Sequence, residues 1–285
     1  MQHGGALLGY QHRYHAGNHA DVLKHTVLVA LLEHLLRKDK PFSYVETHAG
    51  TGVYDLEGPE ALRQREHETG IARLWAREDL PEVVAAYVRR VRELNPDGVL
   101  RRYPGSPALA LALRRPSDPV DLFELHPGEF ARLQDAFGGA PRLRLVQGDG
   151  LEGCIGLLPP PSRRGLVLVD PSWELKTDVD AVLRMLRHAH RRFDGGVFAI
   201  WYPVVERARC ERFCRRVRET GIRDVLRFEL CVAADAEARG MTGSGMVVVN
   251  PAFTLEARMR EALPWLEATL GEGRGRWLVQ RLAEE

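Results

Sequence analysis

The sequence predicts an α/β protein whose mostly parallel sheet is covered by helices on both faces. From residue 120 onward, short apolar runs alternate with helical patterns, which is the rhythm of βαβ units. The run Gly165-Leu166-Val167-Leu168-Val169 is apolar throughout, as expected of a central parallel strand that is buried on both sides. Several strand-like runs end in acidic or glycine-containing loops, and the ligands of such sheets bind beyond the carboxyl ends of the strands.

The first predicted elements are a helix and a strand. Residues 18–37 place apolar side chains at the spacing of one helix face, and Pro41 ends the pattern, since proline cannot continue a helix. Residues 42–46 form a short strand-like run that leads into a loop with Gly50 and Gly52. The backbone must turn tightly at these two glycines.

An insertion is predicted between the first two strands. The second strand begins about 70 residues after the first one ends, whereas a βαβ unit needs only about 30 residues. The intervening chain has helical patterns at 66–75 and 81–94, which indicate a small helical subdomain. The chain therefore divides into three parts: residues 1–54, with an N-terminal segment, the first helix and the first strand; residues 55–105, the insertion; and residues 106–285, the rest of the core.

The remaining elements follow in a regular order. The predicted strands are 120–124, 143–147, 165–169 and 196–202, and the helices between and after them are 127–137, 151–158, 178–192 and 205–219. Two more strand-like runs, 224–233 and 245–250, flank a glycine-rich loop and predict a terminal antiparallel hairpin. The expected sheet has seven strands.

The composition excludes several classes of protein. The 285 residues are 45% hydrophobic and 28% charged, with a net charge of +1, which argues against a disordered chain and against a wholly basic nucleic-acid binder. The longest apolar run, Val27 to Leu32, is too short to span a membrane, and the first residues do not resemble a secretory signal. The four cysteines form no disulfide framework. We therefore expect a cytoplasmic protein with no membrane partner.

The strand ends carry the candidate binding residues. The first strand delivers Glu46 and the loop with Gly50 and Gly52, the second delivers Glu124, and the third delivers Asp149-Gly150. An acidic residue at the end of the second strand is the usual device for holding the hydroxyl groups of an adenosine ribose. Taken singly, each of these features could also be an ordinary turn or a solvated strand end.

The sharpest signal is Asp170-Pro171-Ser172-Trp173, directly after the buried strand. The Asp170 carboxylate and the Pro171 carbonyl could each accept one N–H of an exocyclic amine on a planar base, while Trp173 stacks on the flipped ring. Two such hydrogen bonds would aim the nitrogen lone pair at an electrophilic methyl group. The alternative is a strand end with a turn proline and a packed tryptophan.

The N-terminal segment is unusually rich in polar residues. It contains His12, His15, His19, Lys24 and His25, and Lys24 is one of only four lysines among 40 basic residues. A metal site is one explanation, although the spacing fits no closed zinc motif. Helix capping by Asn18 and plain surface exposure are a second. The third, which we favour, is contact with substrate or cofactor.

These residues resemble a known family. The tetrapeptide is similar to the (D/N)PP(Y/F/W) motif of amine methyltransferases that use S-adenosylmethionine. Further motifs follow in order from Tyr10 to the C-terminus and resemble the RlmJ family, which methylates N6 of one adenine in bacterial large-subunit (23S) ribosomal RNA. They are residues 10–25, 47–52, 103–107, 124–127, 201–203 and 240–242. The resemblance implies a Rossmann-like class I methyltransferase fold.

The resemblance also implies roles for matching residues. Asp170, Pro171 and Trp173 would form the catalytic set, and Tyr10, Lys24 and Trp173 would contact the substrate. The residues expected to line the S-adenosylmethionine pocket are His25, His48, Gly50, Gly52, Ser106, Glu124, Asp149, Gly150 and Asp170. No metal is expected. The RNA would be naked or in an assembly intermediate, its backbone held by arginines of the insertion, and the enzyme would be a monomer.

One departure from the family pattern bears on activity. The family motif is commonly Asp-Pro-Pro-Tyr, whereas this chain has Ser172 and Trp173. Loss of the second proline could loosen the loop. Two alternatives therefore stay open: an adenine methyltransferase that acts on DNA, because a pocket for a flipped base cannot itself detect the 2′-hydroxyl, and a nucleic-acid-binding homologue with impaired catalysis.

Overall fold

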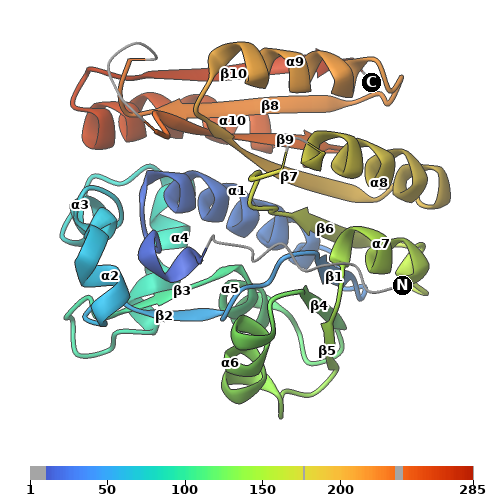
Figure 1. Cartoon of the computed structure of the whole chain (residues 1–285), viewed down its shortest axis with the longest axis horizontal. Coiled ribbons are helices and arrows are strands. Elements are labelled where there is room, and N and C mark those ends of the chain that lie inside the picture. The colour runs from blue at the N-terminus through green and yellow to red at the C-terminus, as the bar shows by residue number, and fades with distance from the viewer. Residues whose placement is uncertain (1–10, 176, 235–239, 285) are drawn as a thin grey trace.

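The computed structural model describes residues 11–175, 177–234 and 240–284. They form one eight-stranded sheet and a separate two-stranded ribbon. Helices α1 and α10 lie on one face of the large sheet, and α8 and α9 lie on the other (Figure 1). The order of strands across the sheet is β10 (Arg276–Ala283), β8 (Val225–Cys231), β9 (Gly243–Val249), β7 (Val197–Val204), β6 (Gly165–Val169), β1 (Ser43–Glu46), β4 (Val120–Glu124) and β5 (Leu143–Gln147).

The predicted parallel core is confirmed, and the antiparallel end of the sheet has more strand pairings than predicted. Strands β5, β4, β1, β6 and β7 are parallel neighbours. Strand β9 pairs antiparallel with β8, as expected of the hairpin, but it also pairs antiparallel with β7 and so lies between the two. The predicted count of seven strands is wrong because β10 adds an eighth, antiparallel to β8.

Most helices lie where the sequence predicts them. The helices are α1 (His19–Leu36), α2 (Pro59–Gln64), α3 (Ala72–Trp75), α4 (Glu82–Glu93), α5 (Ser106–Leu113), α6 (Pro127–Phe137), α7 (Gly150–Gly153), α8 (Asp178–Arg192), α9 (Arg207–Arg218) and α10 (Leu255–Leu266). The 3₁₀ turns are η1 (His12–Tyr14), η2 (Glu66–Glu68) and η3 (Cys154–Leu157), and η4 (Glu267–Gly271) is a π-helical turn. The helix predicted at 151–158 is α7 followed by the 3₁₀ turn η3. No helix in the described part of the chain is long and apolar enough to span a membrane.

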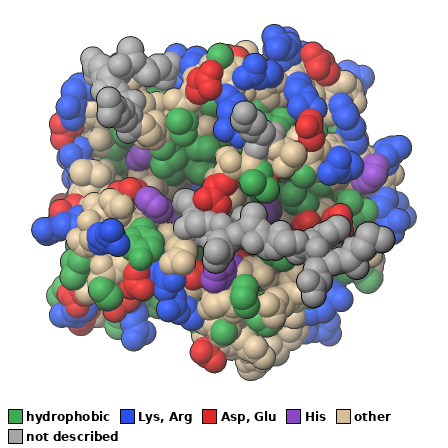
Figure 2. All heavy atoms as spheres, in the orientation of Figure 1, with side chains coloured by type: hydrophobic (Ala, Val, Ile, Leu, Met, Phe, Trp, Pro, Cys, Tyr) green, Lys and Arg blue, Asp and Glu red, His purple; other side chains and the backbone are tan. Residues whose placement is uncertain are grey.

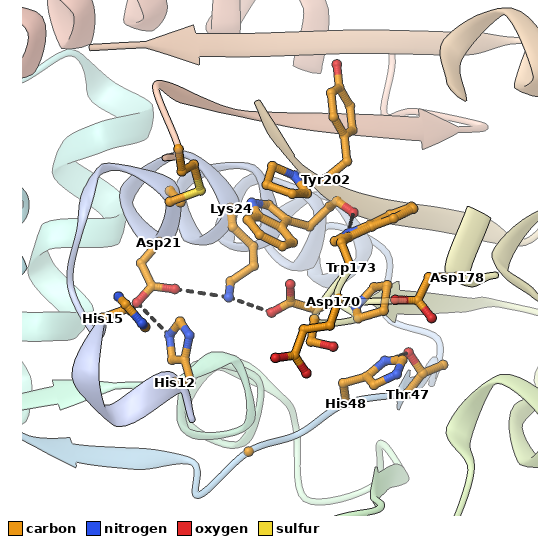
Figure 3. Close-up of a pocket in the computed structure, with 18 of the residues that line it drawn as sticks. His12, His15, Asp21, Lys24, Thr47, His48, Asp170, Trp173, Asp178 and Tyr202 are labelled. Atoms are coloured by element: carbon orange, nitrogen blue, oxygen red, sulfur yellow. Dashed lines mark hydrogen bonds and ion pairs between the residues drawn. The ribbon is translucent and has the colours of Figure 1, made fainter. Parts of the chain in front are cut away.

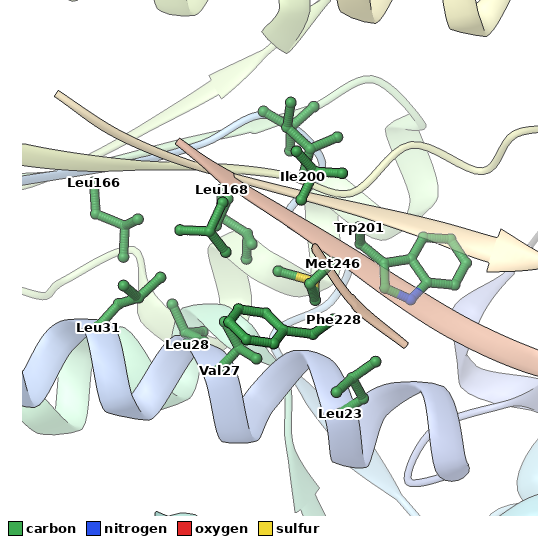
Figure 4. Packing of buried hydrophobic residues seen from close by; sticks show 14 of the residues in the cluster. Leu23, Val27, Leu28, Leu31, Leu166, Leu168, Ile200, Trp201, Phe228 and Met246 are labelled. Atoms are coloured by element: carbon green, nitrogen blue, oxygen red, sulfur yellow. The ribbon is translucent and has the colours of Figure 1, made fainter. Parts of the chain in front are cut away.

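Helix α1 is the central helix of the core. Its Leu23, Val27 and Leu31 face side chains of β6, β7, β8 and β9, as Figure 4 shows. The opposite side is covered by α4, α5 and α10. The sequence predicted one apolar face, but α1 is buried on nearly all sides, because the sheet covers one side and α4, α5 and α10 cover the others.

Both ends of α1 are capped by side chains. The Asn18 carboxamide oxygen accepts hydrogen bonds from the backbone N–H groups of Ala20 and Asp21 at 2.9 and 3.0 Å, as expected at an N-cap. At the other end, Arg164 donates to the Leu35 carbonyl and Arg115 to the Leu36 carbonyl, at 2.8 and 2.7 Å. Two guanidinium groups therefore satisfy carbonyls that the helix leaves unpaired.

The insertion contains the predicted helices and an additional ribbon. Strand β2 (Val53–Asp55) pairs antiparallel with β3 (Arg102–Pro104), and α2, α3 and α4 lie between them in sequence. Helix α4 packs on α1 and α10. The division at residues 54 and 105 stays a prediction, since the buried face of α4 belongs to the same core as α1.

Candidate active site

A cavity of about 970 Å³ opens at the carboxyl ends of the parallel strands, the edge where doubly wound sheets bind ligands. The space-filling view shows a hollow on this face in which hydrophobic, histidine and acidic side chains lie (Figure 2). Its lining comes from the ends of β1, β4, β5, β6 and β7, together with η1 and the first turns of α1. The volume is near the upper end of the range of about 300–1,000 Å³ that is typical of ligand pockets.

Asp170 lies in the cavity and is bound to a lysine from α1. The Lys24 ammonium donates to Asp170 Oδ2 at 2.6 Å and lies 3.0 Å from Asp21 Oδ1 (Figure 3). The other oxygen of Asp21 accepts from the Gly17 amide at 2.8 Å and lies 2.9 Å from His12 Nε2. A chain of hydrogen bonds and ion pairs therefore runs from η1 through α1 to the loop after β6.

Burial and neighbouring charges set the pKa values of Lys24 and Asp21. Burial opposes the charge on Lys24, but Asp170 and Asp21 outweigh it and hold the pKa of the ammonium well above its ordinary value. Burial likewise opposes ionisation of Asp21, yet His12 and Lys24 hold its pKa well below the usual range. Lys24 was predicted to contact substrate. The structure places its ammonium between two carboxylates, with only 5% of the side chain exposed.

Asp21 was missed by the sequence analysis. It lies one helical turn before Lys24, and side chains at i and i+3 share a helix face. The i, i+3 spacing of Asp21 and Lys24 could therefore have predicted their contact.

The loop after β1 is fixed by the acidic residue at the end of β4. Glu124 accepts hydrogen bonds from the backbone N–H groups of Gly50 at 2.8 Å and His126 at 2.7 Å. Gly50 and Gly52 have φ angles of +60° and +79°, which only glycine adopts without strain. Glu124 and Gly50 both line the cavity, but Gly52 is not among its lining residues. A Cβ on Gly52 would lie 2.4 Å from Phe137, so Gly52 serves packing, and its contact with cofactor stays a prediction.

The third strand end delivers Asp149 and Gly150. Asp149 caps α7 by accepting from Leu151 N at 2.8 Å. A Cβ on Gly150 would lie 2.2 Å from the Thr47 carbonyl oxygen, so the loops after β1 and β5 touch at a point where no side chain fits. Both residues line the cavity.

Ser106 and His25 line the cavity and belong to separate buried networks. Ser106 donates to Glu46, which also accepts from the Tyr44 hydroxyl at 2.8 Å. Burial raises the pKa of Glu46 to about 8, against these two hydrogen bonds. His25 Nδ1 bonds the Tyr103 hydroxyl at 2.7 Å, and burial lowers the pKa of His25 to about 3. At neutral pH, Glu46 is protonated and His25 is uncharged.

His48 also lines the cavity. Thr47 Oγ1 lies 2.7 Å from its Nδ1. Burial lowers the pKa of His48, although Asp170 and Glu124 act in the opposite direction. The imidazole is therefore a neutral group that can exchange hydrogen bonds with a ligand.

Trp173 is anchored more firmly than the sequence suggested. Its indole N–H donates to the Trp201 carbonyl at 3.0 Å, and its ring meets Phe213 edge to face with centroids 5.2 Å apart. Arg209 donates to the Trp173 carbonyl at 3.4 Å, and the φ angle of Trp173 is +57°. Only 7% of Trp173 is exposed, so its stacking on a base stays a prediction.

Three of the histidines near α1, His12, His15 and His25, are engaged with carboxylates or a tyrosine, whereas the buried Nε2 of His19 has no hydrogen-bond partner among the described residues. His12 pairs with Asp21, and His15 Nδ1 lies 2.8 Å from Glu66. Across residues 11–175, 177–234 and 240–284, no group of three or more His, Cys, Asp or Glu side chains is arranged to hold a metal. The prediction for Tyr10 lies outside the described residues.

The sheet and the cavity together define a class of protein. A mostly parallel sheet with antiparallel strands at one end fits the Rossmann-like methyltransferase fold that the resemblance implied, and the Asp170-Pro171 turn follows β6 at the edge where ligands bind. The protein is a Rossmann-like methyltransferase. A family model described as ribosomal RNA large subunit methyltransferase D, RlmJ, matches residues 39–283. The chain therefore belongs to the RlmJ family.

Curated relatives and a solved structure agree with this assignment. The chain is 46% identical over 278 residues to the ribosomal RNA large subunit methyltransferase J of Escherichia coli (strain K12), covering 96% of this chain and 99% of that protein. It is 46% identical over 281 residues to the protein of the same name from Haemophilus influenzae, covering 98% and 100%. A crystal structure of a protein from Legionella pneumophila str. Philadelphia 1 matches with a TM-score of 0.87 and 36% identity, covering 94% and 98%.

Proposed function

We propose that this protein uses S-adenosylmethionine to methylate the exocyclic N6 amine of one adenine in 23S ribosomal RNA. The observation that carries the proposal is the Asp170 carboxylate in the cavity, held by Lys24 at 2.6 Å. The curated relatives are named as ribosomal RNA large subunit methyltransferases, which supports RNA as the polymer.

The residues of the cavity fit S-adenosylmethionine. Gly50 and Gly150 line the cavity near Glu124, and a Cβ on either glycine would lie within about 2.5 Å of protein atoms, so backbone rather than side chains forms this part of the wall. Glu124 can hold ribose hydroxyls, and Asp149 lies at the adjoining strand end. Leu125 is 51% exposed next to Glu124, so an apolar surface is available for an adenine ring. When bound, the cofactor supplies an electrophilic methyl group on a sulfonium.

The chain's own residues position the amine. Lys24 binds Oδ2 of Asp170, and this leaves Oδ1 to accept one N–H of the substrate amine. The Pro171 carbonyl, on the cavity wall, accepts the second. Holding both N–H groups directs the nitrogen lone pair and favours the tetrahedral geometry that develops during attack. No strong base is needed, because the methylated amine loses its extra proton readily.

Lys24 controls the orientation of Asp170. An unpaired carboxylate in a buried site would be costly, and the ammonium both offsets that charge and fixes the carboxylate plane. Asp21 in turn holds the ammonium at 3.0 Å. Lys24 and Asp21 therefore act through Asp170 as positioning residues in this proposal.

Methyl transfer by an Asp170→Ala variant tests the proposal. We expect turnover on unmodified 23S ribosomal RNA to fall by a factor of about 100 or more, because the positioned hydrogen-bond acceptor is removed, while cofactor binding by calorimetry persists. An Asp135→Ala variant, which removes an exposed carboxylate, serves as the control. Near-normal turnover by Asp170→Ala would overturn the mechanism.

The same assay separates the alternatives. Label recovered as N6-methyladenine from RNA alone supports the proposal, and label in matched DNA would identify a DNA methyltransferase instead. Cofactor and RNA binding without transfer would identify a homologue with impaired catalysis. We also propose that the protein acts as a cytoplasmic monomer on naked RNA or an assembly intermediate.

A further inference from the structure

The cavity is poorly suited to hold the RNA backbone by itself. Nine carboxylate side chains line it, but only two lysine or arginine side chains in the described part of its wall do so, Lys24 and Arg209. Lys24 is already bound between Asp21 and Asp170. Because phosphate contacts supply most of the sequence-independent affinity for nucleic acid, a polyanionic substrate needs cations elsewhere on the protein.

The arginines of the insertion, which the sequence suggested for this task, are largely engaged. Arg90 pairs with Glu93 at 2.7 Å, and Arg101 pairs with Asp97. Arg92 donates to the carbonyl of Trp75 at 2.7 Å. These contacts lie within the insertion itself, so three of the five arginines predicted to hold the RNA stabilise local structure instead. The five are Arg89, Arg90, Arg92, Arg101 and Arg102.

The opposite edge of the sheet carries a concentration of positive charge. The loops before β1, β4 and β6 meet there, at residues 37–41, 114–119 and 159–164, and contain seven basic and two acidic residues. The whole chain has a net charge of only +1. Arg115 and Arg164 join the loops, because both donate to carbonyls at the end of α1, including that of Lys38 at 2.7 Å from Arg115.

Four of these basic side chains are exposed and form no ion pair with another described residue. They are Arg37, Lys38, Lys40 and Arg163. The ion pairs of the described residues at the end of α1 and on the 114–119 loop, Arg258 with Glu33 and Arg115 with Asp118, include none of the four. We call the three loops together with Phe253 the amino-edge surface.

Phe253 adds an aromatic ring to this surface. It is 79% exposed, an unusual state for a phenylalanine. The Arg37 guanidinium lies over its ring, 5.6 Å from the centroid, and His34 meets it edge-on at 5.5 Å. A ring supported in this way, beside unpaired cations, is the combination that binds single-stranded nucleic acid by stacking and phosphate contact.

We propose that the amino-edge surface binds the ribosomal RNA that flanks the target adenine, with Lys38, Lys40 and Arg163 on phosphates and Phe253 on an unpaired base. The proposal rests on RNA being the substrate. Lys24 lies near the start of α1 and Arg37 caps its C-terminal end, about 20 Å away along the helix axis. An RNA that reaches both ends of α1 is therefore held at two places, one for chemistry and one for affinity.

Methyl transfer by a Lys38→Glu/Lys40→Glu variant tests the surface. The substrates are a long 23S RNA fragment and a stem-loop of fewer than about six base pairs, which spans less than about 20 Å. We expect KM for the long fragment to rise about tenfold, with kcat unchanged and the short RNA unaffected. The slope of log affinity against log salt should fall by about 1 to 2.

The control is Arg184→Glu/Arg187→Glu, which makes the same change of charge on the exposed side of α8. An equal rise of KM in this control, an equal rise for the short RNA, or no rise at all would overturn the proposal. If the unaltered protein methylates neither RNA, the proposed function fails, whereas direct binding of the long fragment still tests the surface.

A Phe253→Ala variant examines stacking separately from charge. We expect its affinity for the long fragment to fall about fivefold or more, because stacking on an aromatic ring is lost, with the salt slope unchanged. An unaltered affinity would overturn the role given to Phe253.

Discussion

Trp173 illustrates how one residue can compensate for another. The chain has Ser172 where the resembling family commonly has a second proline, and the backbone there lacks that ring's rigidity. Trp173 supplies three anchors instead: its N–H bond to Trp201, its ring contact with Phe213, and its carbonyl bond from Arg209. The loop that carries Asp170 is therefore held from its far side.

A Trp173→Phe variant should show this anchoring. It keeps an aromatic ring but leaves the buried Trp201 carbonyl without its donor, which costs about 1–3 kcal/mol of stability. We expect kcat to fall while cofactor affinity is retained, as measured by steady-state kinetics and calorimetry. Trp265→Phe, which removes an exposed N–H contact with Asp79, is the control. Lower stability with unchanged kcat would show that the bond is only structural.

Glu46 should give the protein a distinctive pH dependence. Its pKa is raised from 4.5 to about 8, mainly by burial, so between these values the folded state holds a proton that the unfolded state releases. The contribution of Glu46 to the unfolding free energy is therefore fully present below about pH 4.5. It is lost as pH rises toward 8, by at most about 1.4 kcal/mol per pH unit.

A Glu46→Gln variant cannot release that proton and should lose this part of the slope. Its amide can donate to one of the hydroxyls of Tyr44 and Ser106 and accept from the other. Denaturant unfolding at pH 5, 6, 7 and 8 measures the difference, with exposed Glu219→Gln as the control. Parallel slopes for all three proteins would contradict the assignment.

At the scale of elements, β10 completes the sheet and protects β8. All seven residues of β8 are buried, and β10 pairs with β8 along the full length of β8. Removal of residues 276–285 should expose that edge, and loss of the buried Val279 and Leu282 alone should cost about 3 kcal/mol or more. Unfolding in urea and light scattering would show lower stability and self-association.

The control truncation removes only residues 284 and 285. If the longer truncation leaves stability and association state unchanged, β10 is a dispensable addition.

The sequence predicted the elements that have strong local patterns. The bounds of β4, α6, β5, β6 and α8 match the prediction, because alternating strand and helix periods and flanking turns define them locally. Strand β10 was missed, since its partner β8 lies some 50 residues earlier and its side chains are half-exposed. Helix α10 was missed as well; it contains Pro264, which normally argues against a helix interior.

The active site was predictable in part for a similar reason. Each strand end could be recognised from neighbouring residues, and the structure brings Gly50, Glu124, Asp149 and Asp170 to one cavity. The bond from Lys24 to Asp170 joins residues 146 positions apart, and no local pattern specifies such a contact.

For the whole molecule, cofactor binding should stabilise the fold. S-adenosylhomocysteine at a hundredfold excess over its Kd should add about 2.7 kcal/mol, equivalent to a rise in Tm of about 5 °C for a chain of this size. Differential scanning calorimetry measures this shift. A Glu124→Ala variant should show a smaller rise in Tm. The control variant Glu152→Ala, which changes an exposed carboxylate, should show the full rise. No shift in the unaltered protein would contradict the cofactor assignment.

The position of β9 has a consequence for biosynthesis. Strands β7 and β8 are not neighbours, because β9, made after both, lies between them. At about 5–20 residues per second, the ribosome reaches Val249 roughly 1–4 s after Cys231. During that interval the edges of β7 and β8 that will face each other across β9 have no partner strand. A chaperone that recognises unpaired strand edges would find its opportunity there, before translation supplies the strand that joins β7 to β8.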